Sequence, residues 1–132
     1  MRNFNFIILV IFFISCDEVD VTQNTSRGLV INEFLASNDE CCPDESNDYD
    51  DWVELYNDTP DDIDIGGMYF TDTPNDDNPY QIPSTDPSKT TIPSKGYLLI
   101  WCDDDQEQGP THVSKKLKKG GESIILISSD KL

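Results

Sequence analysis

The stretch 43–52, PDESNDYDDW, holds a dense group of possible metal ligands. Ca²⁺ takes about six to eight hard oxygen ligands, and a loop that mixes acids with asparagine can supply them. The spacing lacks the glycine hinge and the distal glutamate of an EF-hand. Two interpretations stay open: a solvated acidic loop, and a calcium site. The candidate ligands are Asp44, Asn47, Asp48, Asp50 and Asp51.

Two further acidic stretches, NDDNP at 75–79 and CDDDQEQ at 102–108, are weaker candidates for the same chemistry. The whole chain has 26 acidic and 9 basic residues, for a net charge of −17. Such a field repels phosphates and anionic lipids, so binding to nucleic acid through a basic surface is excluded. It favours cations and cationic partners, although a solvated acidic surface is the simplest explanation.

Cys16 stands where an apolar run ends and an acidic one begins. The run 4–15, FNFIILVIFFIS, follows a short positive start, which is the pattern of a secretory signal and is short for a membrane span. The junction Ile14-Ser15-Cys16 resembles the bacterial lipobox, in which a small residue precedes a cysteine that becomes lipidated and N-terminal. More than one acyl chain gives stable anchoring. We expect a lipoprotein signal peptide at 1–15; an ordinary signal peptide cleaved elsewhere is the alternative.

This interpretation predicts a bacterial cell-envelope protein, periplasmic or surface-exposed, that is held on the membrane through Cys16. The remaining cysteines would then lie in an oxidising compartment. Because three is an odd number, several arrangements stay open. Cys41 or Cys42 could pair with Cys102, the adjacent pair could close on itself, or one thiol could stay reduced.

Residues suited to catalysis do not form a recognisable pattern. The chain has one histidine, His112, and no serine, cysteine or aspartate in a nucleophile-elbow sequence. No His-Glu-x-x-His or Cys-x-x-Cys spacing indicates zinc. We expect no enzyme activity and no cofactor apart from calcium, with His112 on the surface or at a sheet edge.

Short runs of β-branched and aromatic residues alternate with turn-rich loops from residue 28 onward, and no segment keeps a helical period. In the run 52–56, Val53 and Leu55 share one face, as in a half-buried strand. The runs 97–101 and 123–128 are continuously apolar and predict central strands. Lys119-Gly120-Gly121-Glu122 predicts a hairpin connection. The predicted strands are 29–35, 52–56, 63–70, 80–82, 97–101, 113–117 and 123–128.

About seven short strands with regular turn signals predict an all-β fold, a β-sandwich. We divide the chain into the signal peptide at 1–15, an acidic and polar tether at 16–27, and one domain at 28–132, in which a last strand after the run 123–128 could be missing. Asn32 and Glu33 interrupt an apolar strand, and we expect structural roles for them; if they are half-buried, backbone groups of a neighbouring loop should bind them.

Several motifs together resemble a lamin-tail domain of the bacterial secreted type. They are LVINEFLASND, DDWVELYND, DIDIGGMYFTD, TTIPSKGYLLIWCDDD and KLKKGGESIILIS, in this order over roughly 28–128. The resemblance implies an immunoglobulin-like sandwich, export to the bacterial surface, no catalytic residues, and a role in interaction or attachment.

The leading hypothesis is a cell-envelope lipoprotein that carries a non-catalytic binding or attachment module. Its partners would be the membrane, through lipidated Cys16, and an unknown protein or surface polymer. Two alternatives stay open: an N-terminal accessory fragment of an exported hydrolase, and a purely structural envelope spacer.

Overall fold

The computed structural model describes residues 28–121 and 123–130. The proposed signal peptide, Cys16 and the tether lie outside these residues. Within the described part of the chain, no helix is long and apolar enough to cross a membrane.

A four-stranded sheet forms one layer of the domain. Its strand order is β1-β2-β7-β8; β8 is parallel to β7, and the other neighbours are antiparallel. β2 and β7 therefore occupy the centre, where Val53 lies opposite Ile100. The bounds are Leu29–Leu35 for β1, Asp51–Asn57 for β2, Tyr97–Cys102 for β7 and His112–Val113 for β8.

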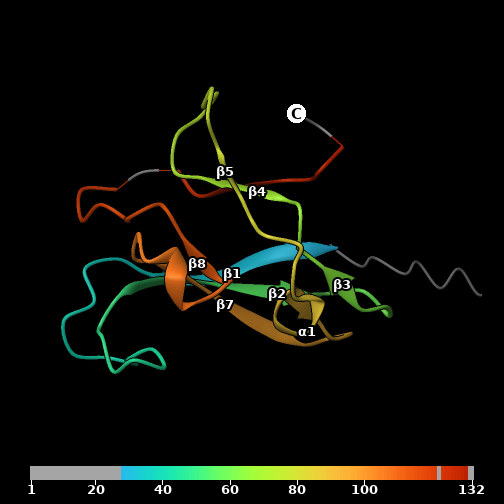
Figure 1. Cartoon of the computed structure of the whole chain (residues 1–132), viewed down its shortest axis with the longest axis horizontal. Coiled ribbons are helices and arrows are strands. Elements are labelled where there is room, and N and C mark those ends of the chain that lie inside the picture. The colour runs from blue at the N-terminus through green and yellow to red at the C-terminus, as the bar shows by residue number, and fades with distance from the viewer. Residues whose placement is uncertain (1–27, 122, 131–132) are drawn as a thin grey trace, which may run out of the picture.

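A three-stranded sheet with the order β5-β4-β9 forms the opposing layer (Figure 1). A short two-stranded ladder, β3 with β6, lies beside these sheets. The bounds are Ile63–Asp64 for β3, Tyr69–Thr71 for β4, Tyr80–Gln81 for β5, Thr91–Ile92 for β6 and Ile125–Ile127 for β9. The helical elements are α1, Pro87–Thr90, and the 3₁₀ turn η1, Gln106–Gln108.

The core lies between the two layers. Val53 and Leu55 are fully buried, as their alternation in the sequence predicts, and Phe70 reaches them from β4. The core also includes Ile65, Ile82, Ile92, Ile100, Cys102, Val113 and Leu117. The strand content and layering agree with the predicted all-β immunoglobulin-like sandwich.

Two predicted strands differ from the structure, and two elements were not predicted. The run 63–70 is divided between β3 and β4, because a turn at Gly67, with φ of +86°, interrupts it. The run 113–117 is a strand only at His112–Val113. The helix α1 and the strand β6 were not predicted; Pro87 and the capping carboxylate of Asp86, which accepts the Ser88 N–H, start α1.

The hairpin predicted at 119–122 is also absent. A turn does form there, since the Gly121 N–H donates to the Lys118 carbonyl. However, β8 pairs with β7 and β9 pairs with β4, so this turn leads the chain from one sheet to the other. β9 is consequently a half-buried edge strand and not a central one.

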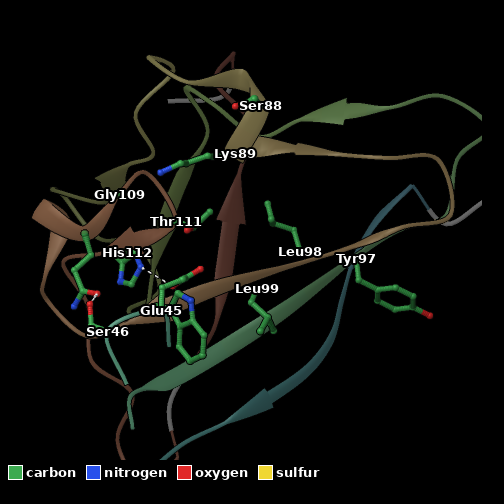
Figure 2. Close-up of a pocket in the computed structure, with 12 residues that line it drawn as sticks. Glu45, Ser46, Ser88, Lys89, Tyr97, Leu98, Leu99, Gly109, Thr111 and His112 are labelled. Atoms are coloured by element: carbon green, nitrogen blue, oxygen red, sulfur yellow. Dashed lines mark hydrogen bonds and ion pairs between the residues drawn. The ribbon is translucent and has the colours of Figure 1, made fainter. Parts of the chain in front are cut away.

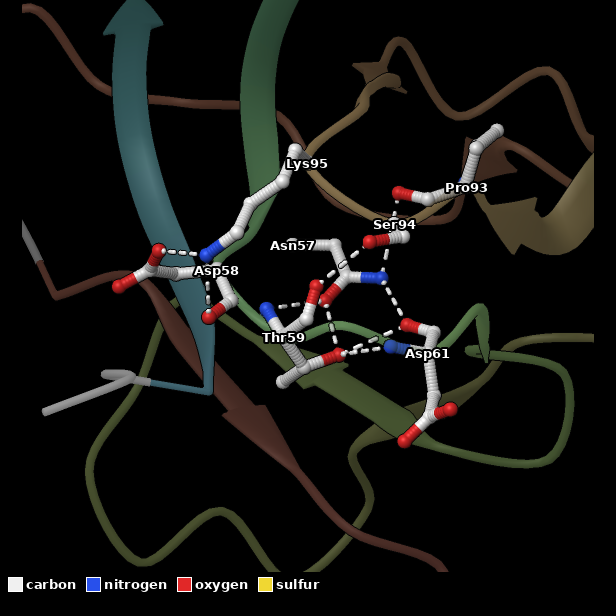
Figure 3. A network of polar contacts seen from close by, with 7 residues as sticks. All are labelled: Asn57, Asp58, Thr59, Asp61, Pro93, Ser94 and Lys95. Carbon is white, nitrogen blue, oxygen red and sulfur yellow. Dashed lines mark hydrogen bonds and ion pairs between the residues drawn. The ribbon is translucent and has the colours of Figure 1, made fainter. Parts of the chain in front are cut away.

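Asn57 ties the end of β2 to the segment around β6 (Figure 3). Its buried Nδ2 donates to the carbonyls of Asp61, Ile92 and Pro93, at 2.8, 3.0 and 3.2 Å. Its Oδ1 accepts the N–H and the hydroxyl of Thr59, at 2.9 and 2.7 Å. One amide side chain therefore satisfies five polar groups where two loops meet.

Asn32 and Glu33 are exposed on β1, so the half-burial that would require backbone partners does not apply to Asn32. Its Nδ2 donates instead to Oε1 of Glu54 on the adjacent strand, at 2.7 Å. A register shift between Ile31 and Glu33 accompanies this arrangement.

The lysines that follow β8 bind acidic residues of the same chain. Lys115 Nζ lies 2.9 Å from Asp76 Oδ2, and Lys118 Nζ lies 3.7 Å from Asp72 Oδ2. Hydrogen bonds from the Thr71 hydroxyl, the Asn78 N–H and Lys115 lower the pKa of Asp76 to about 2. These contacts hold the segment after β8 against the loop that follows β4.

Candidate functional site

Two loops carry acidic residues to one place beside the β2–β7 pair. Asp44 and Asp50 belong to the β1–β2 loop, residues 36–50, and Asp103 belongs to the β7–β8 loop, residues 103–111. One carboxylate oxygen from each lies within 4.8 Å of the others. We call Asp44, Asp50 and Asp103 the acid cluster.

Strand register explains why these loops meet. Asp51 opens β2 and lies opposite Cys102, the last residue of β7. In an antiparallel pair, the residue before one strand lies near the residue after the other. Asp50 and Asp103 are therefore neighbours, although 53 positions separate them in the sequence.

The acid cluster contains only part of the predicted calcium site. Asp44 and Asp50 belong to it, whereas Asn47 and Asp48 are exposed on the outside of the loop. Asp51 has another contact, because its Oδ1 accepts the backbone N–H of Asn38 at 2.9 Å. Sequence reasoning placed Asp103 only in a weaker stretch, and the acid-rich run CDDDQEQ was the signal available.

The surroundings of Asp50 oppose its ionisation. Burial raises the pKa of Asp50, and the nearby charges of Asp103, Asp44 and Asp48 raise it further. Lys116 acts in the opposite direction on this pKa. The negative charge of Asp50 is therefore not fully compensated by its neighbours.

His112 lies on β8, the edge strand of its sheet, as one of the two predicted positions, but it is buried, with 3% of its surface exposed, and does not lie on the surface. Its Nδ1 forms a hydrogen bond with Oδ2 of Asp103, and its Nε2 lies 3.8 Å from Oε2 of Glu45. Its ring also stacks on Trp101, with centroids 6.3 Å apart. The parallel pairing of β8 with β7 places His112 opposite Trp101 and accounts for its burial.

An open cleft of about 700 Å³ lies next to this region. We call it the edge cleft; Figure 2 shows β7 running through it, with Ser88 and Lys89 of α1 on one side and Glu45 and Ser46 on the other. It is lined by Glu45, Ser46, Ser88, Lys89, Tyr97, Leu98, Leu99, Trp101, Gln108, Gly109, Thr111 and His112.

The backbone of β7 is open toward the edge cleft. Within the described part of the chain, β8 pairs only with Trp101 and Cys102, and no strand neighbours the first part of β7 on this side. The Trp101 N–H donates away from β2, to the Thr111 carbonyl at 2.8 Å. Because backbone groups alternate in direction along a strand, those of Leu99 and Tyr97 also point away from β2, toward the open edge.

Within the described residues, the cleft shows no contact between a nucleophile and a base. The Ser46 hydroxyl donates to Oε1 of Gln108 at 2.6 Å, while the two ring nitrogens of His112 face Asp103 and Glu45. This geometry suits binding better than nucleophilic catalysis.

The three cysteines among the described residues differ in exposure. Cys41 and Cys42 are exposed thiols, whereas Cys102 is buried in the core. A hydrogen bond with Cys41 raises the pKa of the Cys42 thiol. The disulfide involving Cys41, Cys42 or Cys102 stays a prediction.

Comparison with known protein families supports the arrangement of strands just described. A family model described as Lamin Tail Domain matches residues 22–132. The chain belongs to the lamin tail domain family. No curated protein and no solved structure matches the sequence. The lamin tail domain is an immunoglobulin-like family without catalytic activity of its own, and the resemblance inferred from the sequence motifs is confirmed.

Proposed function

We propose that this chain is an envelope-anchored, non-catalytic attachment module, whose lamin tail domain binds an extended peptide segment of a partner protein. The single observation that carries the binding proposal is the open edge of β7 inside the edge cleft. An edge strand presents unpaired N–H and C=O groups, which an extended peptide can pair with as an additional strand.

The residues around the edge suit this mode of binding. Leu99 and Tyr97 offer their backbone groups to the peptide, and β8 prevents pairing beyond Trp101. Side chains of the peptide would contact Lys89 on one wall and Glu45 on the other. Main-chain hydrogen bonds provide affinity in such complexes, and pockets for alternate side chains provide specificity.

Proline at position 99 tests the use of this edge. Leu99→Pro removes an N–H that does not bond to β2, so the β2–β7 ladder stays intact. Leu99→Ala removes the same side chain and keeps the N–H. The probes are linear peptides selected from a random phage library on the full chain in detergent. They should bind Leu99→Pro about tenfold more weakly than Leu99→Ala, because the proline variant lacks one hydrogen bond to the peptide. Calorimetry gives both affinities.

Equal affinities for the two variants would contradict the proposal. Selection that yields no peptide, together with binding of a host envelope polysaccharide fraction, would indicate a surface polymer as the partner. Thermal unfolding of both variants checks that proline leaves the domain folded.

The anchor is proposed from the sequence around Cys16, where the apolar run ends. When the full chain is expressed in a bacterium, the protein recovered from membranes should begin at Cys16 and carry acyl mass, as measured by intact mass spectrometry. Cys16→Ser should move it out of the membrane fraction. Cleavage at another residue without acyl mass would contradict the anchor and leave the binding proposal standing.

A further inference from the structure

The acid cluster contains a carboxylate oxygen that the protein itself does not satisfy. Oδ1 of Asp44 accepts the backbone N–H groups of Ser46 and Asp48, both at 2.8 Å. Oδ2 of Asp44 is buried and has no hydrogen-bond partner among the residues that the structure describes. Since buried polar atoms normally have partners, this atom indicates a missing ligand. Because Oδ1 already accepts two hydrogen bonds within the loop, Oδ2 is the oxygen of Asp44 that can bind such a ligand.

The surroundings of this oxygen specify the charge of the ligand. Asp44 and Asp103 are each only 7% exposed, and Asp50 is partly buried. Three carboxylates at this separation repel one another strongly when they are removed from water. The groups of opposite or variable charge nearby are Lys116, close to Asp50, and His112, which is bonded to Asp103. A cation among the three carboxylates would relieve the repulsion and give Oδ2 a partner.

We propose that Asp44, Asp50 and Asp103 bind one calcium ion. The donors are all carboxylate oxygens, the ligand type that Ca²⁺ prefers, and water can complete its flexible coordination shell. Mg²⁺ demands a tighter octahedral arrangement and keeps more of its own water. The site joins the β1–β2 loop to the β7–β8 loop, and it therefore fixes the wall of the edge cleft that carries Glu45 and Ser46.

A second group of donors lies beside the first and uses the same aspartate. Asp44, Glu45 and His112 also offer atoms within 4.8 Å of one another. An imidazole nitrogen favours zinc or another transition metal. Glu45, however, has a side chain that is 80% exposed, and its oxygen lies 3.8 Å from His112 Nε2. The buried, all-oxygen acid cluster is better formed, and the experiment below distinguishes the two.

Asp50→Asn is the most direct test, because no side chain or backbone group in the described ranges 28–121 and 123–130 donates a hydrogen bond to the Asp50 carboxylate. Thermal unfolding of the full chain in detergent is measured in chelator, in millimolar CaCl₂, and in MgCl₂ at equal ionic strength. Calcium should raise the wild-type midpoint by about 5–10 °C, since a ligand of the folded state stabilises it by mass action. Calorimetry should show one Ca²⁺ per chain.

Asp50→Asn should weaken calcium binding at least about tenfold, since it removes one of three charged ligands. In chelator it should unfold at the wild-type temperature or above it, because a repulsive charge is gone. Asp77→Asn, which removes the same charge from an exposed position outside the acid cluster, should bind calcium as the wild type does. Asp103→Asn is a second variant that should lose calcium.

The proposal would be overturned if calcium bound neither tightly nor in a one-to-one ratio, or if Asp50→Asn and Asp77→Asn behaved alike. Zinc binding that depends on Glu45 and His112 but survives Asp50→Asn would also overturn it and assign a transition-metal site.

Discussion

Asn57→Ala lowers the free energy of unfolding by about 3 kcal/mol or more. The side chain is fully buried, and it satisfies three carbonyls with its amide and two donors of Thr59 with its oxygen. Each hydrogen bond contributes about 1 kcal/mol, and each partner left buried without water costs about 1–3 kcal/mol. Water can reach the exposed partners near Thr59, which keeps the total below the sum of five separate losses. Urea unfolding followed by tryptophan fluorescence measures the change.

Asn32→Ala provides the matched control. Asn32 makes one hydrogen bond, to Glu54, on an exposed face of β1. Its replacement should change the free energy of unfolding by less than about 0.5 kcal/mol. Equal effects of the two substitutions would mean that the Asn57 contacts do not hold the ends of β2 and β6 together.

Phe70→Ala should destabilise the domain by about 3–5 kcal/mol. Phe70 is among the largest fully buried side chains and brings β4 into the core formed with Val53 and Leu55. Loss of the ring removes apolar burial and leaves a cavity that the surrounding strands fill only in part. For a domain whose total stability lies near 5–15 kcal/mol, this is a large fraction. Denaturant unfolding measures the change, provided that the dependence of the unfolding free energy on denaturant concentration is the same in both proteins.

Phe34→Ala serves as its control, because the Phe34 side chain is 57% exposed. We expect a loss of less than about 1 kcal/mol for this substitution, since little apolar area is removed from the interior. A loss as large as that of Phe70→Ala would contradict the assignment of the core to the space between the two sheets.

Local patterns in the sequence predicted the central pair of strands and its inward face. The alternation around Val53 and Leu55 and the apolar run at 97–101 correspond to β2 and β7. Leu117, an apolar residue between pairs of lysines, is buried as well. These features depend only on residues that are close together in the sequence, so a periodic pattern is enough to predict them.

The candidate site depends on pairings that local patterns do not report. Asp103 joins Asp44 and Asp50 only because β2 lies antiparallel to β7. His112 is buried because β8 runs parallel to β7. The sequence had instead predicted that the strand containing His112's neighbours would form a hairpin with the last strand. The open edge of β7 follows from the short length of β8. Each feature is a consequence of strand order, which a single sequence does not specify.

The central claim is that an extended peptide pairs with the open edge of β7, and amide hydrogen exchange at Leu99 tests it most directly. The Leu99 N–H points away from β2, so it should exchange rapidly in the unliganded chain. A bound peptide selected on the full chain should slow this exchange at Leu99, while Ile100, whose N–H lies in the β2 ladder, should stay protected with or without peptide. Tight binding of the peptide with no change at Leu99 would contradict the account.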